Sequence, residues 1–155
     1  MREDPGLYDY WPYEGRPALR WPNGARLAFW VAPNIEFYEL DPPPNPKRQA
    51  WLQPYPAIAG YSIRDYGNRV GHQRQMEVLD RFGIRGSISL SAALCEHHPE
   101  IIELCAERNW EFFSHGIYNT RYTYGLSEDE ERSMILDAMD TIERHTGQRP
   151  AGYLA

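Results

Sequence analysis

The chain has 155 residues, of which 42% are hydrophobic and 25% are charged, a composition typical of one globular domain and not of a disordered or fibrous protein. Its net charge of −6, without a cluster of Lys and Arg, argues against non-specific binding to nucleic acid or to an anionic membrane. Two cysteines, Cys95 and Cys105, are too few for a disulfide framework, and Cys105 fits a small buried hydrophobe. Residues 1–15 show no secretory signal and no apolar run could span a membrane, so we predict a cytoplasmic protein.

We treat residues 1–155 as a single domain that begins with an irregular aromatic segment over residues 1–25. Aromatic residues stand beside prolines there, as in Trp21-Pro22, and again at 51–56. Proline removes a backbone donor and restricts the residue before it, so these stretches predict ordered loops. Two uses remain open for their rings: a wall that stacks on sugars or other rings, and, more commonly, a cover for an edge of the core.

The elements that follow alternate between strands and helices. The apolar run 26–32 predicts a first strand, buried on both faces and ended by Pro33, and the proline-rich segment from Asp41 opens a long irregular connection that reaches about Tyr66. Further strands are predicted at 86–90 and 110–114, and the start of a fourth at 151–155.

Three helices are predicted between these strands. Apolar residues at helical spacing place the first over residues 69–82, with Gly83 to stop it. Pro99 opens the second, which extends to about Arg108. Ser127 and Glu130 have the spacing of a capping box and open the third, which ends near residue 147.

The order βαβαβαβ predicts an α/β protein with a parallel sheet, either doubly wound or a barrel. No glycine-rich phosphate loop follows the first strand, which disfavours the nucleotide-binding folds and favours a barrel. Four strands cannot close a barrel that needs about eight. We therefore expect that the chain is part of a larger barrel, or that something else covers an open edge of the sheet.

Two side chains stand where parallel α/β proteins place their reactive groups, at the carboxyl ends of strands. Glu36 follows the first predicted strand, and His115 follows the third. A carboxylate and an imidazole brought together can act as general base and acid, or as two ligands of a hydrolytic metal. The alternative is a hydrogen-bonded structural histidine and a solvated glutamate.

The other polar candidates have weaker cases. His72, His97 and His98 lie on or near helix ends without a partner four residues away, which favours solvated or capping roles. The polar cluster of Asp65, Tyr66, Asn68 and Arg69 precedes the first predicted helix, and it could line a cleft or only cap that helix.

Five blocks of the sequence resemble the polysaccharide deacetylase superfamily (carbohydrate esterase family 4, NodB homology), in particular the branch that contains a bacterial metal-independent allantoinase. The blocks have the order and spacing of that branch: WPNGARLA at 21–28, DYGNRVG at 65–71, HPEII at 98–102, SHG at 114–116 and TGQRPAGY at 146–153. The resemblance implies a distorted (β/α)7 barrel, of which this chain covers roughly the first half. It also implies hydrolysis of carbon–nitrogen bonds other than peptide bonds, in N-acetylated sugars or in small or cyclic amides such as allantoin.

The resemblance also implies a set of site residues. Typical members bind a divalent metal such as Zn through an Asp after the first strand and two His residues; here His115 matches the first His, Asn119 stands in place of the second, and Asn34 and Glu36 flank the acidic motif. A metal would be held by Glu36 and His115. Without a metal, Glu36 becomes the base for a water and His115 the group that polarises or protonates the leaving group. The residues predicted to bind substrate are Asn34, Tyr66, Tyr118 and Asn119.

Two departures from the family keep other functions open. Leu154 stands in place of an Arg in the family's next motif, and the final motif, with another catalytic His, would lie beyond Ala155. One alternative is a non-catalytic module that binds a carbohydrate or a ureide. Another is that the barrel is completed by a second copy, by a separate polypeptide or by a missing C-terminal half.

Overall fold

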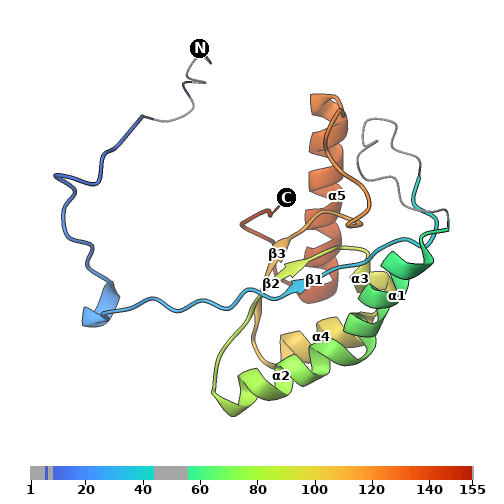
Figure 1. The fold of residues 1–155 in the computed structure, drawn as a ribbon, viewed down its shortest axis with the longest axis horizontal. Helices are drawn as coiled ribbons and strands as arrows, with labels where there is room; N and C mark the ends of the chain where they lie inside the picture. Colours follow the sequence, from blue (N-terminus) through green and yellow to red (C-terminus); the bar gives the residue numbers. More distant parts are fainter. Residues whose placement is uncertain (1–5, 7–8, 44–55, 155) are drawn as a thin grey trace.

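The computed structural model describes Gly6, residues 9–43 and residues 56–154. Its elements are, in chain order, the 3-10 turn η1 (Pro22–Gly24), β1 (Asn34–Ile35), α1 (Ile58–Tyr66), the π-helical segment η3 (Gly67–Gly71), α2 (His72–Arg81), β2 (Ser87–Leu90), α3 (Leu94–His97), α4 (Pro99–Glu107), β3 (Glu111–Ser114) and α5 (Glu128–Thr146). Strands and helices alternate as the sequence predicts (Figure 1).

The three strands form one parallel sheet in the order β1-β2-β3. This confirms a parallel α/β architecture; the described residues form a small sheet, and the barrel itself is not closed within them. At the predicted fourth strand, Tyr153 makes a single parallel bridge to Ser114. Two backbone bonds of 2.9 Å, from the Ser114 amide to the Gly152 carbonyl and from the Leu154 amide to the Ser114 carbonyl, hold this last segment beside β3.

The predicted first strand at 26–32 is wrong in position. Pairing begins at Val31, which bridges Gly86, and continues through Pro33, whose carbonyl accepts a bond from the Ser89 amide at 3.0 Å. Pro33 does not end the strand, because an edge strand needs only the carbonyl of a proline and not the missing N–H. Most of the apolar run stays outside the sheet, so Leu27 and Phe29 are 76% and 72% exposed rather than buried on both faces.

The predicted irregular connection up to Tyr66 is also wrong at its end. Helical backbone runs from Ile58 through α1, η3 and α2 to Arg81. The sequence signal is weak because Gly60, Gly67 and Gly71 lower helix propensity across this stretch. Gly83, with φ of 61°, stops the helix as predicted. The polar cluster at 65–69 therefore lies within the helical run and does not precede it.

The core lies between the sheet and the helices α2, α4 and α5. Strand residues such as Ile35, Ile88 and Phe112 belong to one buried hydrophobic cluster, which also includes Met76 of α2 and Ile142 of α5. The α5 helix begins as predicted, with the Ser127–Glu130 capping box, and ends at Gly147 in the left-handed conformation. Both cysteines are buried, and burial raises the pKa of Cys95 to about 11 and that of Cys105 to about 12, so both stay neutral thiols.

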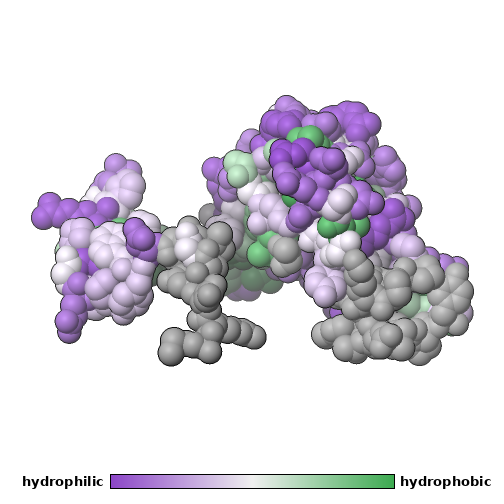
Figure 2. All heavy atoms as spheres, turned by 90° about the horizontal axis from the view of Figure 1, so that it is seen from above, coloured by the Kyte–Doolittle hydropathy of each residue, from purple (hydrophilic) through white to green (hydrophobic). Residues whose placement is uncertain are grey.

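The N-terminal segment does not cover the core edge, contrary to the commoner use predicted for its aromatics. Tyr10 and Tyr13 are each 88% exposed, and Trp11 contacts the Arg16 guanidinium 5.0 Å from its ring centre. The segment extends away from the rest of the fold (Figures 1 and 2). The face of the fold seen in Figure 2 is mainly hydrophilic, with small hydrophobic areas. The aromatic stretch at 51–55 lies outside the described residues.

Among the described residues, no helix has the length and apolar character needed to cross a membrane.

Candidate active site

The parallel register brings three strand ends into one row. Asn34 of β1 pairs with Ser89 of β2, which pairs with Phe113 of β3. Two residues further along each strand, the same register gives the row Glu36, Ser91, His115. The ladder continues to this point, because the Ser91 amide donates to the Ile35 carbonyl at 3.0 Å and the His115 amide donates to the Leu90 carbonyl at 2.8 Å. Side chains two apart on a strand share a face, so these three side chains point to one side of the sheet.

Glu36 and His115 form a hydrogen-bonded pair in this row. His115 Nε2 lies 3.2 Å from Glu36 Oε1, and the two side chains are only 10% and 23% exposed for His115 and Glu36 respectively. His115 Nδ1 lies 2.7 Å from the Leu154 carbonyl oxygen. A carbonyl and a carboxylate can only accept, so both ring nitrogens donate and the geometry fits a doubly protonated imidazolium.

The electrostatics of the pair agree with this protonation. The hydrogen bond from His115 lowers the pKa of Glu36, against the effect of its partial burial. The hydrogen bond to Glu36 raises the pKa of His115, with a further contribution from the Leu154 carbonyl. Both shifts favour the charged forms, a carboxylate that can accept a proton and an imidazolium that can give one.

Side chains from distant segments hold Glu36 in place. The amide of Asn68, which is 6% exposed, donates to the Glu36 backbone carbonyl at 3.0 Å. The neighbouring Tyr38 hydroxyl helps to lower the pKa of Glu36. Asn119 Nδ2 in turn donates to the Tyr38 hydroxyl at 2.6 Å, and the Arg64 guanidinium lies 4.6 Å from the centre of the Tyr38 ring. This network links Glu36 and Tyr38 to the helical run 58–81 and to the segment after β3.

The residues predicted to bind substrate take different positions. Asn34 is exposed and lies two residues before Glu36, on the same face of the strand. Asn119 lies in the network, through Tyr38. Tyr118 packs edge-on against Phe37, with ring centres 5.9 Å apart. Tyr66, on α1, is 56% exposed, and no hydrogen bond in the described part of the chain joins it to the pair.

Sequence reasoning missed several residues of the site. Tyr38 follows Glu36 by two positions, and that spacing, which puts both on one side of an extended chain, could have indicated it. His72 is predicted to be solvated or capping, yet burial lowers its pKa, against the effects of Gln75 and, to a lesser extent, of the charge of Glu36. Asn68 gave no signal beyond its polar character, because its role depends on a contact with a residue 32 positions away.

The residues present do not fit a divalent metal. Within the described ranges, no three His, Cys, Asp or Glu side chains come together. His115 uses both ring nitrogens for hydrogen bonds to the protein, and Asn119 directs its amide nitrogen, which is no ligand, at Tyr38. The donor set is that of an ion pair rather than of a metal centre.

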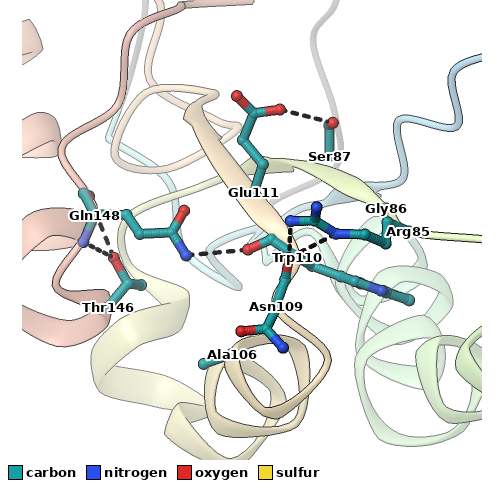
Figure 3. A pocket seen from close by; sticks show the side chains of 9 residues that line it. All are labelled: Arg85, Gly86, Ser87, Ala106, Asn109, Trp110, Glu111, Thr146 and Gln148. Carbon is teal, nitrogen blue, oxygen red and sulfur yellow. Dashed lines mark hydrogen bonds between the residues drawn. The ribbon is translucent and has the colours of Figure 1, made fainter.

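A hollow of about 750 Å³ lies at the opposite end of the sheet, where β2 and β3 begin. Figure 3 shows Gln148 and Arg85 directed at the backbone carbonyls of Trp110 and Asn109. Glu111 also lines the hollow, and its carboxylate accepts a hydrogen bond from the Ser87 hydroxyl at 2.9 Å. None of the titratable residues predicted for the site lines this hollow.

Three solved structures are similar to this chain. PuuE allantoinase matches with a TM-score of 0.74 and 26% identity, over 96% of this chain and 54% of that one. A protein named as a probable polysaccharide deacetylase from Pseudomonas aeruginosa PAO1 matches with a TM-score of 0.72 and 25% identity, over 87% of this chain and 48% of that one. A carbohydrate esterase family 4 pseudoenzyme from Bacillus anthracis matches in fold, with a TM-score of 0.51 and 22% identity, over 56% of this chain and 30% of that one.

The chain spans about half the length of the first two of these structures. The sequence itself matches no family model and no curated protein. The shared fold covers the strand ends that carry Glu36 and His115, since nearly the whole chain aligns with PuuE allantoinase.

Proposed function

Because this chain belongs to the polysaccharide deacetylase superfamily and resembles its allantoinase-like branch, we propose that it hydrolyses carbon–nitrogen bonds other than peptide bonds. Its substrate is an N-acetylated sugar or a small or cyclic amide such as allantoin. The observation that carries the proposal is the Glu36 carboxylate, 3.2 Å from the His115 ring at the carboxyl ends of parallel strands.

Glu36 and His115 divide the work of amide hydrolysis. The Glu36 carboxylate takes a proton from a water as the water oxygen bonds to the carbonyl carbon of the substrate. The imidazolium of His115 gives its Nε2 proton to the amide nitrogen as the carbon–nitrogen bond breaks, which leaves a carboxyl group and an amine. Glu36 is then protonated and His115 neutral, and transfer of the proton between them restores the resting pair.

The neighbouring polar side chains bind and orient the substrate. Asn34 presents an exposed amide on the face of the pair and can hydrogen-bond a carbonyl or an N–H of the substrate. Asn119 is linked to the segment that carries Glu36 by its bond to Tyr38, and Tyr118 by its ring contact with Phe37. Tyr66, on α1, is 56% exposed and can offer its ring to the substrate.

The finer architecture follows from the same family. The parallel sheet is part of a (β/α)7 barrel, and the remaining strands come from further polypeptide or from a second copy of the chain. Support comes from the match to about half of each relative and from the exposed rings of Phe29 and Trp30, which are 72% and 68% exposed beside the edge strand.

The proposal is tested by hydrolysis of allantoin and of N-acetylglucosamine oligomers by the wild-type chain, with Glu36→Gln and His115→Ala beside it. We expect turnover by the wild type that persists after dialysis against a chelator, and a loss of about 10³-fold or more in both variants. Glu111→Gln, at the other end of the sheet, serves as a matched control and should keep the full rate. A wild type that binds these compounds without turnover would replace the hydrolase by a binding module.

A further inference from the structure

Three serines alternate along β2 and the residue after it, so they share one face of the sheet. Ser87, Ser89 and Ser91 are 9%, 0% and 0% exposed. The Ser87 hydroxyl donates to Glu111 Oε2 at 2.9 Å. The hydroxyls of Ser89 and Ser91 are buried with no hydrogen-bond partner among the described residues. Buried hydroxyls are nearly always paired in folded proteins, so each of these two requires an explanation.

Ser91 lies between the two reactive groups. By the register of the sheet it stands opposite Glu36 on one neighbouring strand and opposite His115 on the other. Neighbouring strands are about 4.8 Å apart, so the two outer residues are about twice that distance apart at their backbones. The 3.2 Å contact between Glu36 Oε1 and His115 Nε2 therefore spans the row in which Ser91 stands, and Ser91 is 0% exposed.

The other end of β2 shows what such a serine does beside an available carboxylate. Ser87 and Glu111 are register partners on neighbouring strands, and their side chains are hydrogen-bonded. Ser91 has the same relation to Glu36 by the continued register, but Oε1 of that carboxylate already lies 3.2 Å from His115 Nε2. Ser91 thus stands beside a carboxylate that is turned toward His115 in the resting pair.

We propose, on the basis of the hydrolase function above, that Ser91 is a positioning residue whose hydroxyl donates a hydrogen bond to the Glu36 carboxylate when substrate separates that carboxylate from His115. The separated carboxylate loses one donor and needs another in order to stay aimed at the water. The Ser91 hydroxyl supplies that donor. Ser91 acts through Glu36 and does not itself touch the substrate.

The test compares the kinetics of Ser91→Ala with those of Ser89→Ala. Ser89 is equally buried and equally unpaired, but its row holds Asn34 and Phe113 and no carboxylate, so it is a matched control. We expect kcat to fall about tenfold in Ser91→Ala, since a hydrogen bond to a charged group is lost in the reacting complex, with KM changed less than about twofold. Ser89→Ala should keep the wild-type kcat, and Ser91→Thr, which retains the hydroxyl, should recover most of it.

Thermal denaturation of the variants separates this role from a structural one. Ser91→Ala removes an unpaired hydroxyl, so it should be at least as stable as the wild type while it is slower. Equal kcat in Ser91→Ala and the wild type would overturn the role of Ser91 alone. Equal losses in Ser91→Ala and Ser89→Ala would also overturn it. Absence of turnover in the wild type would instead reject the hydrolase function, and the role of Ser91 would fall with it.

Discussion

The two ends of the sheet each carry a carboxylate, Glu36 partly buried and Glu111 exposed, and they differ in what faces it. At the carboxyl end Glu36 meets an imidazole at 3.2 Å, and each group shifts the pKa of the other. At the amino end Glu111 accepts from a serine, and the polar side chains of the hollow are bonded to backbone carbonyls. A hollow of about 750 Å³ therefore marks the end with little titratable chemistry, and the coupled pair marks the reactive end.

The largest difference between the two ends should be seen in turnover. His115→Ala leaves the Glu36 carboxylate without its 3.2 Å partner and the leaving nitrogen without a proton donor, so the rate should fall by about 10³-fold or more. Gln148→Ala breaks the bond to the Trp110 carbonyl at the amino end and should leave the rate unchanged. Equal losses of turnover rate in steady-state assays of these two variants would contradict the functional distinction between the two ends of the sheet.

The next effect should be on stability and should come from the amino end. A Cβ at Gly86 would lie 3.0 Å from two atoms of the ring of Trp110, which is 2% exposed, so the two would be overpacked. Gly86→Ala should therefore destabilise the fold by about 1–3 kcal/mol in chemical denaturation.

Gly71→Ala is the matched control for that substitution. Gly71 has helical φ of −63° and nothing within 4 Å of its Cβ position, so the change should stabilise by about 0.4–1 kcal/mol. Opposite signs for the two substitutions would support the close packing of Trp110 against Gly86, and a neutral Gly86→Ala would contradict it.

The smallest expected effect is a pH dependence of the folding stability that comes from the Glu36–His115 pair alone. The pKa of Glu36 is lowered from 4.5 in the fold, so its contribution is present above that value and is lost as pH falls through the folded pKa. The pKa of His115 is raised from 6.5, so its contribution is present below that value and is lost as pH rises through the folded pKa. The melting-temperature difference between wild type and Glu36→Gln should be greatest between about pH 4.5 and 6.5. A difference that does not vary with pH would contradict the charged pair.

Much of this architecture could be predicted from local sequence patterns. The capping box at Ser127 and the stop at Gly83 act within one turn of helix, so α5 and the end of α2 are found where they are expected. The first strand is misplaced in the prediction because a proline usually ends a strand, whereas the Pro33 carbonyl pairs with β2. The start of α1 at Ile58 is missed because tertiary packing outweighs the low propensity of three glycines.

The candidate site likewise contains residues that local sequence patterns predict and residues that they do not. Glu36 and His115 could be predicted together because parallel strands align their carboxyl ends, a rule that needs no knowledge of side-chain orientation. Asn68 and Leu154 could not be predicted, since each reaches the pair across 32 and 39 residues of chain through one specific contact. The exposed position of Tyr66 likewise depends on α1, which the sequence pattern did not reveal.

The protonation of His115 at neutral pH tests the charged pair most directly. Nitrogen chemical shifts of the histidine rings, assigned by comparison with His115→Ala, report how many protons each ring carries. We predict that both His115 nitrogens are protonated near pH 7, with Nδ1–H bonded to the Leu154 carbonyl and Nε2–H to Glu36. A neutral ring with one protonated nitrogen would contradict the ion pair and the roles of base and acid built on it.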